Sequence, residues 1–335
     1  MQYPVDPGFP HSDEDRELSA ALSGLPVRPV FIMGLHRSGT TFLYDSVARA
    51  FPLSQLTLYR LFYYRRLLRN QRDGGQQRDQ QRLDACFAAL DIRDRKIDSV
   101  PVAADEVEEY GFLLRRLAGS FMLSETTAPL FEQMCRKLLA LEPDSEAVLL
   151  KNPWDTASAA WIAERYPQAR FIYISREPIA VLNSMLNAVL AYLDGPQRYL
   201  EMLLDRGDGR KSYRGGYLVW RLLRGVRAVL GERVIARLAR PLLARHVTRE
   251  LISYRQTLAA MPASQAVEVD YRALVADPAA EMKALATFLG LPLRPEAAQR
   301  IRAGKPRGQL HPALRAYQAT LDKRLRRALQ KAGMA

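Results

Sequence analysis

The chain has 335 residues, of which 48% are apolar, so it is long enough to bury a core without disulfides or a structural metal. Its 49 Lys and Arg exceed its 36 Asp and Glu by 13, and such an excess favours small anions, polyanions or an acidic membrane surface as partners. Two cysteines exclude a disulfide framework, and the first residues lack the pattern of a secretory signal. Without an apolar run of about 18 residues, no membrane-spanning helix is expected, and we predict a cytoplasmic protein.

Residues 1–28 are polar and carry several prolines, which predicts a flexible N-terminal lead-in. From residue 29 onward, short β-branched runs alternate with longer stretches of helical spacing. The runs lie at 29–33, 147–151, 170–175 and 265–270. This alternation predicts a single α/β domain over 29–335, with a doubly wound, mainly parallel sheet flanked by helices and ligands at the carboxyl ends of its strands.

The octapeptide GLHRSGTT at residues 34–41 closes the first predicted strand and opens a helix. The N–H groups and the dipole at a helix start favour anions. Gly34 and Gly39 have the separation of a Walker loop, but Thr40 stands where that loop carries lysine, and the basic residue is instead Arg37. The octapeptide therefore predicts an anion site of a different kind.

This segment is similar to the 5′-phosphosulfate loop of sulfotransferases that use 3′-phosphoadenosine 5′-phosphosulfate (PAPS). The resemblance implies a P-loop-like sulfotransferase fold, PAPS as the donor and 3′,5′-bisphosphoadenosine (PAP) as the product. It assigns the 5′ end of the donor to Arg37, Ser38, Gly39, Thr40, Thr41 and Phe42. A sulfuryl group carries less charge than a terminal phosphoryl group and can be moved without magnesium, so no metal is expected.

Two further segments concern the donor's 3′ phosphate. Residues 171–178 followed by Ser184 resemble the family's 3′-phosphate motif, in which a strand, an Arg-x-Pro and a helical serine follow one another. Arg176 can grip a phosphate with two hydrogen bonds, and the Ser184 hydroxyl can donate another. Residues 304–308 resemble the basic loop that closes over this phosphate, which adds Lys305 and Arg307, although a solvated charged loop explains the same residues.

The segment 148–153 resembles the Lys-x-His segment of cytosolic sulfotransferases, whose lysine contacts the transferring sulfonate and whose histidine is the general base. Lys151 is present, but Pro153 replaces the histidine, so the base is unassigned. Other branches of the superfamily use a glutamate. A positioned base typically accelerates transfer to a hydroxyl by about 10²–10⁴-fold, so one is expected.

Two residues are candidates for this base. Glu106 lies in the acidic segment 102–110, which resembles one in bacterial members of the broad family, and Glu109 would follow one helical turn later on the same face. An acidic first helical turn without a catalytic role explains this segment equally well. His36, inside the octapeptide, is the second candidate and ranks below Glu106.

Residues 205–250 contain twelve Lys or Arg against four Asp or Glu, with leucines and valines at helical spacing between them. This predicts a basic helical insertion. Its helices can simply pack their apolar stripes on the core. Alternatively, with Tyr217 and Trp220 at the boundary, they suit an anionic membrane surface, which would place the protein peripherally on the inner membrane face.

These motifs predict an enzyme that moves a sulfonate from PAPS to a hydroxyl or amine of an unidentified small-molecule, lipid or glycan acceptor. One alternative is a P-loop kinase that uses ATP and magnesium. Another is a non-catalytic membrane-docking protein with an inactive nucleotide fold. Since no nucleic-acid-binding module is recognised, we expect no nucleic-acid partner; the oligomeric state is left open.

Overall fold

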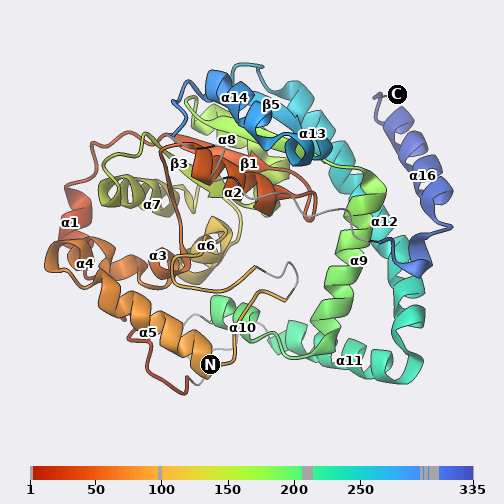
Figure 1. The fold of residues 1–335 in the computed structure, drawn as a ribbon, viewed down its shortest axis with the longest axis horizontal. Coiled ribbons are helices and arrows are strands. Elements are labelled where there is room, and N and C mark those ends of the chain that lie inside the picture. Colours follow the sequence, from red (N-terminus) through yellow and green to blue (C-terminus); the bar gives the residue numbers. More distant parts are fainter. Residues whose placement is uncertain are drawn as a thin grey trace.

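In a computed structural model, the chain folds around a five-stranded sheet in the order β2-β3-β1-β4-β5 (Figure 1). The structure describes residues 3–96, 100–205, 214–294, 297, 301 and 309–334. All neighbouring strands pair in parallel, and helices flank the sheet, which confirms the predicted α/β class. The strands are β1 (Pro29–Met33), β2 (Leu53–Gln55), β3 (Ala147–Lys151), β4 (Arg170–Ser175) and β5 (Ala266–Asp270).

The helices account for most of the remaining described chain. The α-helices are α1 (Arg16–Ala20), α2 (Thr40–Ala50), α3 (Leu58–Phe62), α4 (Leu67–Asp73), α5 (Gln76–Ala89), α6 (Tyr110–Ala118), α7 (Ala128–Leu141), α8 (Ala159–Arg165), α9 (Pro178–Asp194), α10 (Arg198–Leu204), α11 (Arg214–Leu230), α12 (Glu232–Ala260), α13 (Tyr271–Ala276), α14 (Pro278–Leu289) and α16 (Gln318–Lys331). Three short 3₁₀ turns are η1 (Tyr64–Arg66), η2 (Pro153–Ser158) and η3 (Pro312–Leu314).

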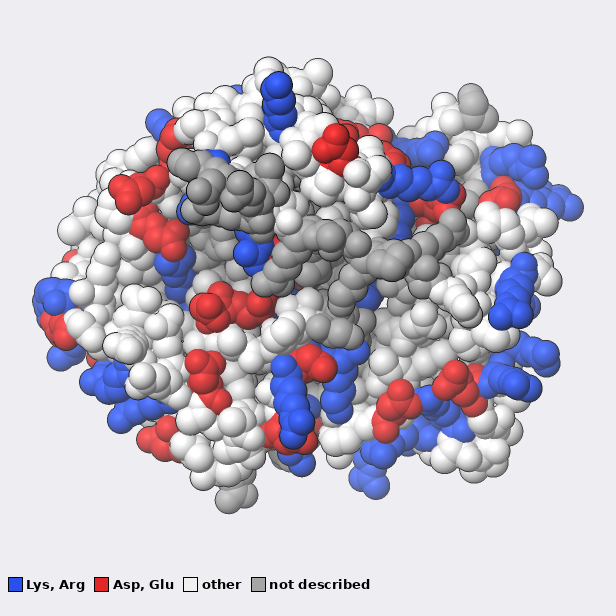
Figure 2. Space-filling model, in the orientation of Figure 1, with Lys and Arg blue, Asp and Glu red and all other residues white. Residues whose placement is uncertain are grey.

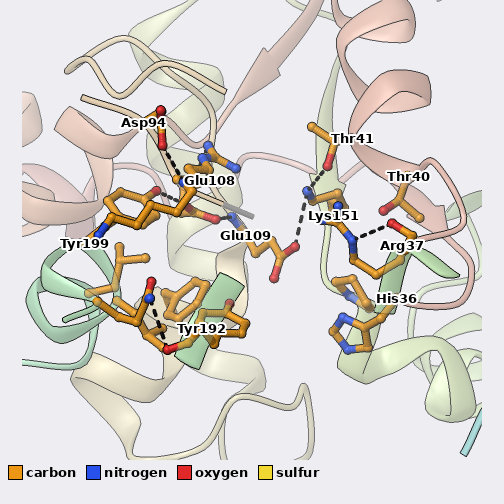
Figure 3. Close-up of a pocket in the computed structure, with 18 of the residues that line it drawn as sticks. His36, Arg37, Thr40, Thr41, Asp94, Glu108, Glu109, Lys151, Tyr192 and Tyr199 are labelled. Atoms are coloured by element: carbon orange, nitrogen blue, oxygen red, sulfur yellow. Dashed lines mark hydrogen bonds and ion pairs between the residues drawn. The ribbon is translucent and has the colours of Figure 1, made fainter. Parts of the chain in front are cut away.

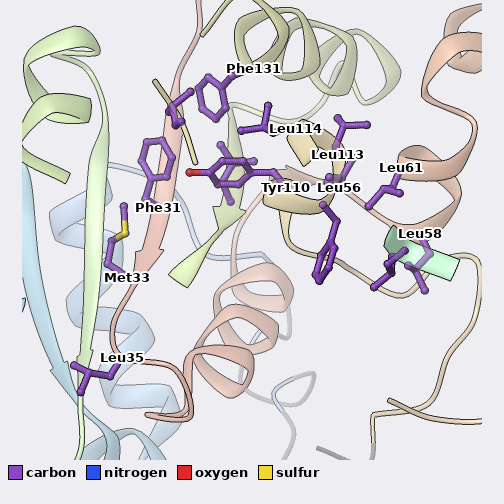
Figure 4. Close-up of a cluster of buried hydrophobic side chains, with 14 of the residues drawn as sticks. Phe31, Met33, Leu35, Leu56, Leu58, Leu61, Tyr110, Leu113, Leu114 and Phe131 are labelled. Atoms are coloured by element: carbon purple, nitrogen blue, oxygen red, sulfur yellow. The ribbon is translucent and has the colours of Figure 1, made fainter. Parts of the chain in front are cut away.

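Helices cover both faces of the sheet, and alternate side chains of a strand enter the core on one face or the other. On β1, Phe31 and Met33 belong to the core under α6, α7 and α9, whereas Val30 and Ile32 belong to the core under α2 and α14. Figure 4 shows the first core, where the rings of Phe31, Tyr110 and Phe131 lie together. Burial on two faces explains why the inner strands β1, β3 and β4 are mainly apolar, whereas the edge strand β5 has exposed residues.

The N-terminal segment, which we expected to be a flexible lead-in, packs on the domain from residue 3 onward. Asp15 and the Lys137 ammonium of α7 form an ion pair at 2.8 Å, and both side chains are fully buried. The Asp15 carboxylate also accepts the N–H groups of Leu68 and Arg69. A buried carboxylate is tolerated only with such partners, so this segment is a covering layer of the fold.

The basic insertion folds as α11 and α12, joined at Gly231. α12 extends ten residues past the predicted end at residue 250 and continues to Ala260. Its second half adds Val247 and Tyr254 to the core, where the Tyr254 ring contacts Tyr173 of β4. Among the residues that the structure describes, no helix combines the length and the apolar character needed to cross a membrane.

Candidate active site

A cavity of about 860 Å³ lies at the carboxyl ends of β1, β3 and β4 (Figure 3). One side of it is formed by the β1–α2 loop, by the last residue of β3 and by the residue that follows β4. The opposite side is formed by residues 91–96, by the segment before α6 and by the connection from α9 to α10. Sites in open parallel sheets form where neighbouring strands end in this way.

The β1–α2 loop needs glycine at two positions. Gly34 has φ +149°, and a Cβ there would lie 2.9 Å from the Ile174 side chain. Gly39 has φ +110°, and a Cβ there would lie 2.4 Å from the Tyr271 ring. Larger residues would be strained and would push the loop away from β4 and α13. The sheet therefore fixes where α2 begins.

The start of α2 offers backbone donors to the cavity. Gly39 is its N-cap, and the first intrahelical hydrogen bond runs from the Leu43 N–H to the Gly39 carbonyl. The N–H groups of Thr40, Thr41 and Phe42 precede that bond, and all three residues line the cavity. With the helix dipole, these groups favour an anion at this end of the cavity.

Two arginines and a serine from separate segments meet beside this helix start. The Arg37 Nε donates to the Ser184 Oγ at 3.1 Å. The Arg176 guanidinium lies 4.2 Å from the centre of the Tyr271 ring and donates to the Arg37 carbonyl at 3.3 Å. The structure thus brings Arg37, which was predicted for the 5′ end of the donor, beside Arg176 and Ser184, which were predicted for its 3′ end. It also places Arg37 at φ +71°, a backbone conformation that is costly for a residue other than glycine.

Lys151, at the end of β3, joins this group to an acidic residue. Its Nζ donates to the Thr41 Oγ1 at 3.2 Å and forms an ion pair with Glu109 Oε1 at 3.2 Å, as Figure 3 shows. The Lys151 side chain is almost fully buried, so both contacts act in a poorly solvated part of the cavity. A carboxylate, an ammonium and a helix start therefore converge on one place.

The chain also matches a known protein family. A model described as the sulfotransferase family matches residues 29–205 and 222–295. The chain belongs to the sulfotransferase family. The stretch left unmatched between these blocks, 206–221, falls within the basic insertion.

Two solved sulfotransferases have a similar fold. Sulfotransferase STF1 from Mycobacterium tuberculosis H37Rv is 19% identical, with a TM-score of 0.52 over 86% of this chain and 74% of its own. Sulfotransferase STF9 from Mycobacterium avium is 16% identical, with a TM-score of 0.57 over 95% of this chain and 79% of its own. No curated protein matches this chain.

The position of Glu109 in this sulfotransferase is set by its neighbours in the chain. Tyr110 is fully buried, and its hydroxyl donates to Asp155 Oδ2 at 2.5 Å, which fixes the start of α6. The Glu109 N–H donates to the Glu108 carboxylate at 2.8 Å. Burial raises the pKa of Asp155 to about 6, against the hydrogen bonds from Tyr110, Leu123 and Asn152 that lower it.

The expectation that Glu106 and Glu109 share a helix face is wrong. α6 begins only at Tyr110, because the bridge between Thr57 and Val107 holds the preceding segment extended. Glu106 is not among the described residues that line the cavity, and its carbonyl accepts the Leu58 N–H at 2.8 Å. Glu106 and His36 were the candidates predicted from the sequence and Glu109 was missed, although a carboxylate directly before the apolar run of α6 was a signal that could have indicated it.

His36 does line the cavity, with its ring edge-on to Trp154 at 5.3 Å between centroids. Burial lowers the pKa of His36 to about 4, and the nearby Lys151 and Arg37 lower it further, against an opposing effect of Glu250. The imidazole is therefore neutral at neutral pH. Its ring contact is with Trp154, whereas Glu109 is the carboxylate that contacts Lys151.

Ser38, Lys305 and Arg307 were also predicted to contact the donor. Ser38 is buried, and both its N–H and its Oγ donate to the Leu35 carbonyl, at 3.1 and 2.8 Å. It is not among the cavity residues that the structure describes, so it closes the loop instead. Lys305 and Arg307 lie outside the described residues.

The far side of the cavity contains residues that the sequence did not reveal. Glu108 is buried, accepts a hydrogen bond from the Tyr199 hydroxyl and lies 3.6 Å from the Arg95 guanidinium. Arg95 also packs over the Tyr199 ring. These residues come from three separate segments with no shared motif, so only the fold brings them together.

Proposed function

We propose that this protein transfers a sulfonate group from PAPS to a hydroxyl or amine of an acceptor and releases PAP. Membership of the sulfotransferase family supports sulfonate transfer in general. The observation that carries the proposal is the contact of Lys151 with both Glu109 and Thr41, at the start of α2. It joins a cation, a candidate base and an anion-binding helix start.

The residues of the cavity fit such a donor. The N–H groups at the start of α2, with the hydroxyls of Thr40 and Thr41, would hold the 5′ phosphosulfate. Arg176 and Ser184 would hold the 3′ phosphate of the donor. Arg37 contacts both of these residues and would link the 3′ end of the donor to its 5′ end. The fixed guanidinium of Arg176 against Tyr271 favours one orientation of that phosphate.

The transfer step follows from the same contacts. Glu109 would accept the proton of the acceptor hydroxyl while the acceptor oxygen forms a bond to sulfur. The bond between sulfur and the 5′-phosphate oxygen breaks, and that oxygen keeps the electron pair. Lys151 would neutralise the charge that develops on this leaving oxygen. The same lysine is paired with Glu109.

Calorimetry with nucleotides tests the donor. We expect PAP to bind in the presence of a chelator and ATP to bind much more weakly, because a loop with Thr40 in place of the Walker lysine lacks the usual ligand of the β- and γ-phosphates. Tighter binding of ATP that requires magnesium would favour a kinase. Binding of neither nucleotide would contradict the proposed donor site.

Mass spectrometry tests the reaction. The purified protein, incubated with isotopically labelled PAPS and an extract of its host, should produce a labelled sulfated species. The Glu109→Gln variant gives the matched control, because it preserves the shape of the side chain and removes the proton acceptor. If PAP binds but no labelled product forms with any acceptor, the non-catalytic alternative is favoured.

A further inference from the structure

One side of α11 is apolar and exposed. Leu218, Leu222 and Val229 are spaced by four and seven residues, which places them on one stripe of the helix. Their exposed fractions are 64, 68 and 83%. Val219, which is 57% exposed, widens this stripe. An amphipathic helix normally turns such a stripe to the core, so this side calls for an explanation.

The opposite side of α11 attaches the helix to the domain. Trp220 Nε1 donates to the Tyr192 carbonyl at 2.6 Å, and Arg227 donates to the Leu190 carbonyl at 2.7 Å. Arg227 also forms an ion pair with Asp194. Trp220 and Arg227 are seven residues apart and so share a stripe, about half a turn from Leu218. The polar side is therefore anchored to α9, and the apolar side faces outward.

The first part of α12 continues the exposed apolar surface. Val234, Leu238 and Leu242 are spaced by four residues and are 38, 59 and 63% exposed. Of the fourteen large apolar side chains that are exposed among the described residues, ten lie between Tyr217 and Leu242. We call residues 217–242 the α11–α12 hairpin. The surface apolar residues of this protein are thus concentrated on one hairpin.

Arginines surround these apolar side chains. The α11–α12 hairpin contains six arginines and one acidic residue, Glu232. Four of the arginines are exposed: Arg221, Arg224, Arg233 and Arg237. Figure 2 shows basic side chains along the lower right margin of the molecule, over the region that α11 and α12 occupy in Figure 1. The hairpin therefore combines apolar area with positive charge.

We propose that the α11–α12 hairpin docks on a bilayer surface that contains anionic phospholipids. The leucines and valines would enter the interfacial region, and the exposed arginines would contact the phosphates of the headgroups. A second copy of the chain fits less well, because a twofold contact through this hairpin would bring two positive surfaces together. This inference does not depend on the donor or acceptor proposed above.

Docking through this hairpin would place the cavity beside the membrane. The Tyr192 carbonyl accepts the hydrogen bond from Trp220 Nε1. Tyr192 also lines the cavity, as does the α9–α10 connection that follows it. The residues that anchor α11 are thus immediate neighbours of the side of the cavity opposite the α2 start.

Sedimentation with vesicles tests the proposal. The full-length protein should bind vesicles of phosphatidylcholine mixed with phosphatidylserine, bind pure phosphatidylcholine weakly, and bind less in high salt. The triple variant Leu218→Gln, Leu222→Gln, Val229→Gln should bind the mixed vesicles at least about tenfold more weakly, because it removes the most exposed apolar area. The matched control, Val5→Gln, Leu25→Gln, Leu293→Gln, changes the same number of exposed apolar residues elsewhere and should bind normally.

A fluorescent label tests the same contact without depending on the triple variant. Cys86 and Cys135 are buried, so a polarity-sensitive dye on Val229→Cys reports mainly on that position. Mixed vesicles should shift its emission to the blue, whereas the dye on Leu25→Cys should not respond.

Three results would overturn the proposal. One is a wild-type protein that does not bind the mixed vesicles. Another is an equal loss of binding in the triple variant and its matched control. The third is a concentration-dependent dimer in analytical ultracentrifugation that the triple variant abolishes, together with no blue shift at Val229→Cys, which would assign the hairpin to contacts between copies of this chain.

Discussion

The carboxyl edge of the sheet and the α11–α12 hairpin both gather arginines, but in different physical settings. At the sheet edge, Arg37 and Arg176 hydrogen-bond to Ser184 and to backbone and face one cavity. On the hairpin, arginines such as Arg221 and Arg237 are exposed and distributed along two helices. Converging charges in a cavity suit a small anion of fixed shape, whereas dispersed ones suit an extended anionic surface.

This difference has a consequence for salt dependence. Interactions between exposed charges are screened within about 10 Å at moderate ionic strength, whereas those in a poorly solvated cavity are screened much less. Vesicle binding by the hairpin should therefore weaken with salt far more steeply than PAP binding by the cavity.

The largest effect is expected at Glu109. Replacing it with glutamine should lower kcat by about 10²–10⁴-fold, since it removes the proposed proton acceptor. PAP affinity, measured by calorimetry, should change little. Glu106→Gln is the matched control, because Glu106 is outside the described cavity lining, and it should keep wild-type turnover. Equal slowing in both variants would contradict the role of Glu109.

Arg176→Ala should weaken PAP binding by about 1.5–3 kcal/mol, roughly 10–150-fold in Kd, the scale of a lost charge-assisted hydrogen bond. Arg221→Ala removes an exposed arginine from the hairpin and should leave the calorimetric Kd unchanged while reducing vesicle binding. If PAP binds to Arg176→Ala with unchanged affinity, Arg176 does not hold the 3′ phosphate.

Two glycines allow the regions to be perturbed separately. Gly39→Ala places a Cβ against Tyr271 at positive φ, and Gly231→Ala places one in open space at φ +78° and ψ +164°. Each should lower the free energy of unfolding by about 1–3 kcal/mol in urea titrations. Gly39→Ala should weaken only PAP binding, and Gly231→Ala only vesicle binding. Loss of both activities in either variant would mean that the regions are not independent.

The smallest effect concerns His36. Its pKa is lowered from 6.5 to about 4, mainly by burial, so the unfolded chain binds more protons than the native protein between these values. The contribution of His36 to the free energy of unfolding is fully present above about pH 6.5 and decreases as the pH falls toward 4. Between neutral pH and about pH 5.5, the free energy of unfolding should fall by on the order of 1 kcal/mol more in the wild type than in His36→Gln, as measured by urea denaturation. Parallel pH profiles would contradict the lowered pKa.

Local sequence predicted much of the sheet and its anion site. The runs that form β1, β3 and β4 are mainly apolar because both faces of each strand are buried, and that pattern is visible in any short window. The edge strand β5 shows instead an alternation, in which Val267 and Val269 are separated by the exposed Glu268. β2 was missed because a three-residue strand, Leu53–Gln55, is too short to show a period. The glycines of the octapeptide were visible because their backbone conformations are nearly unique to that residue.

The sequence by itself determined the parallel α/β fold, the glycine loop and the basic, amphipathic character of residues 205–250, because each depends on contiguous residues. Only the tertiary structure decided that Glu109 rather than Glu106 meets Lys151, that Arg37 contacts Ser184, and that the apolar side of α11 points outward. Those outcomes depend on contacts between residues far apart in the chain. A pattern read along one segment does not contain the position of its distant partner.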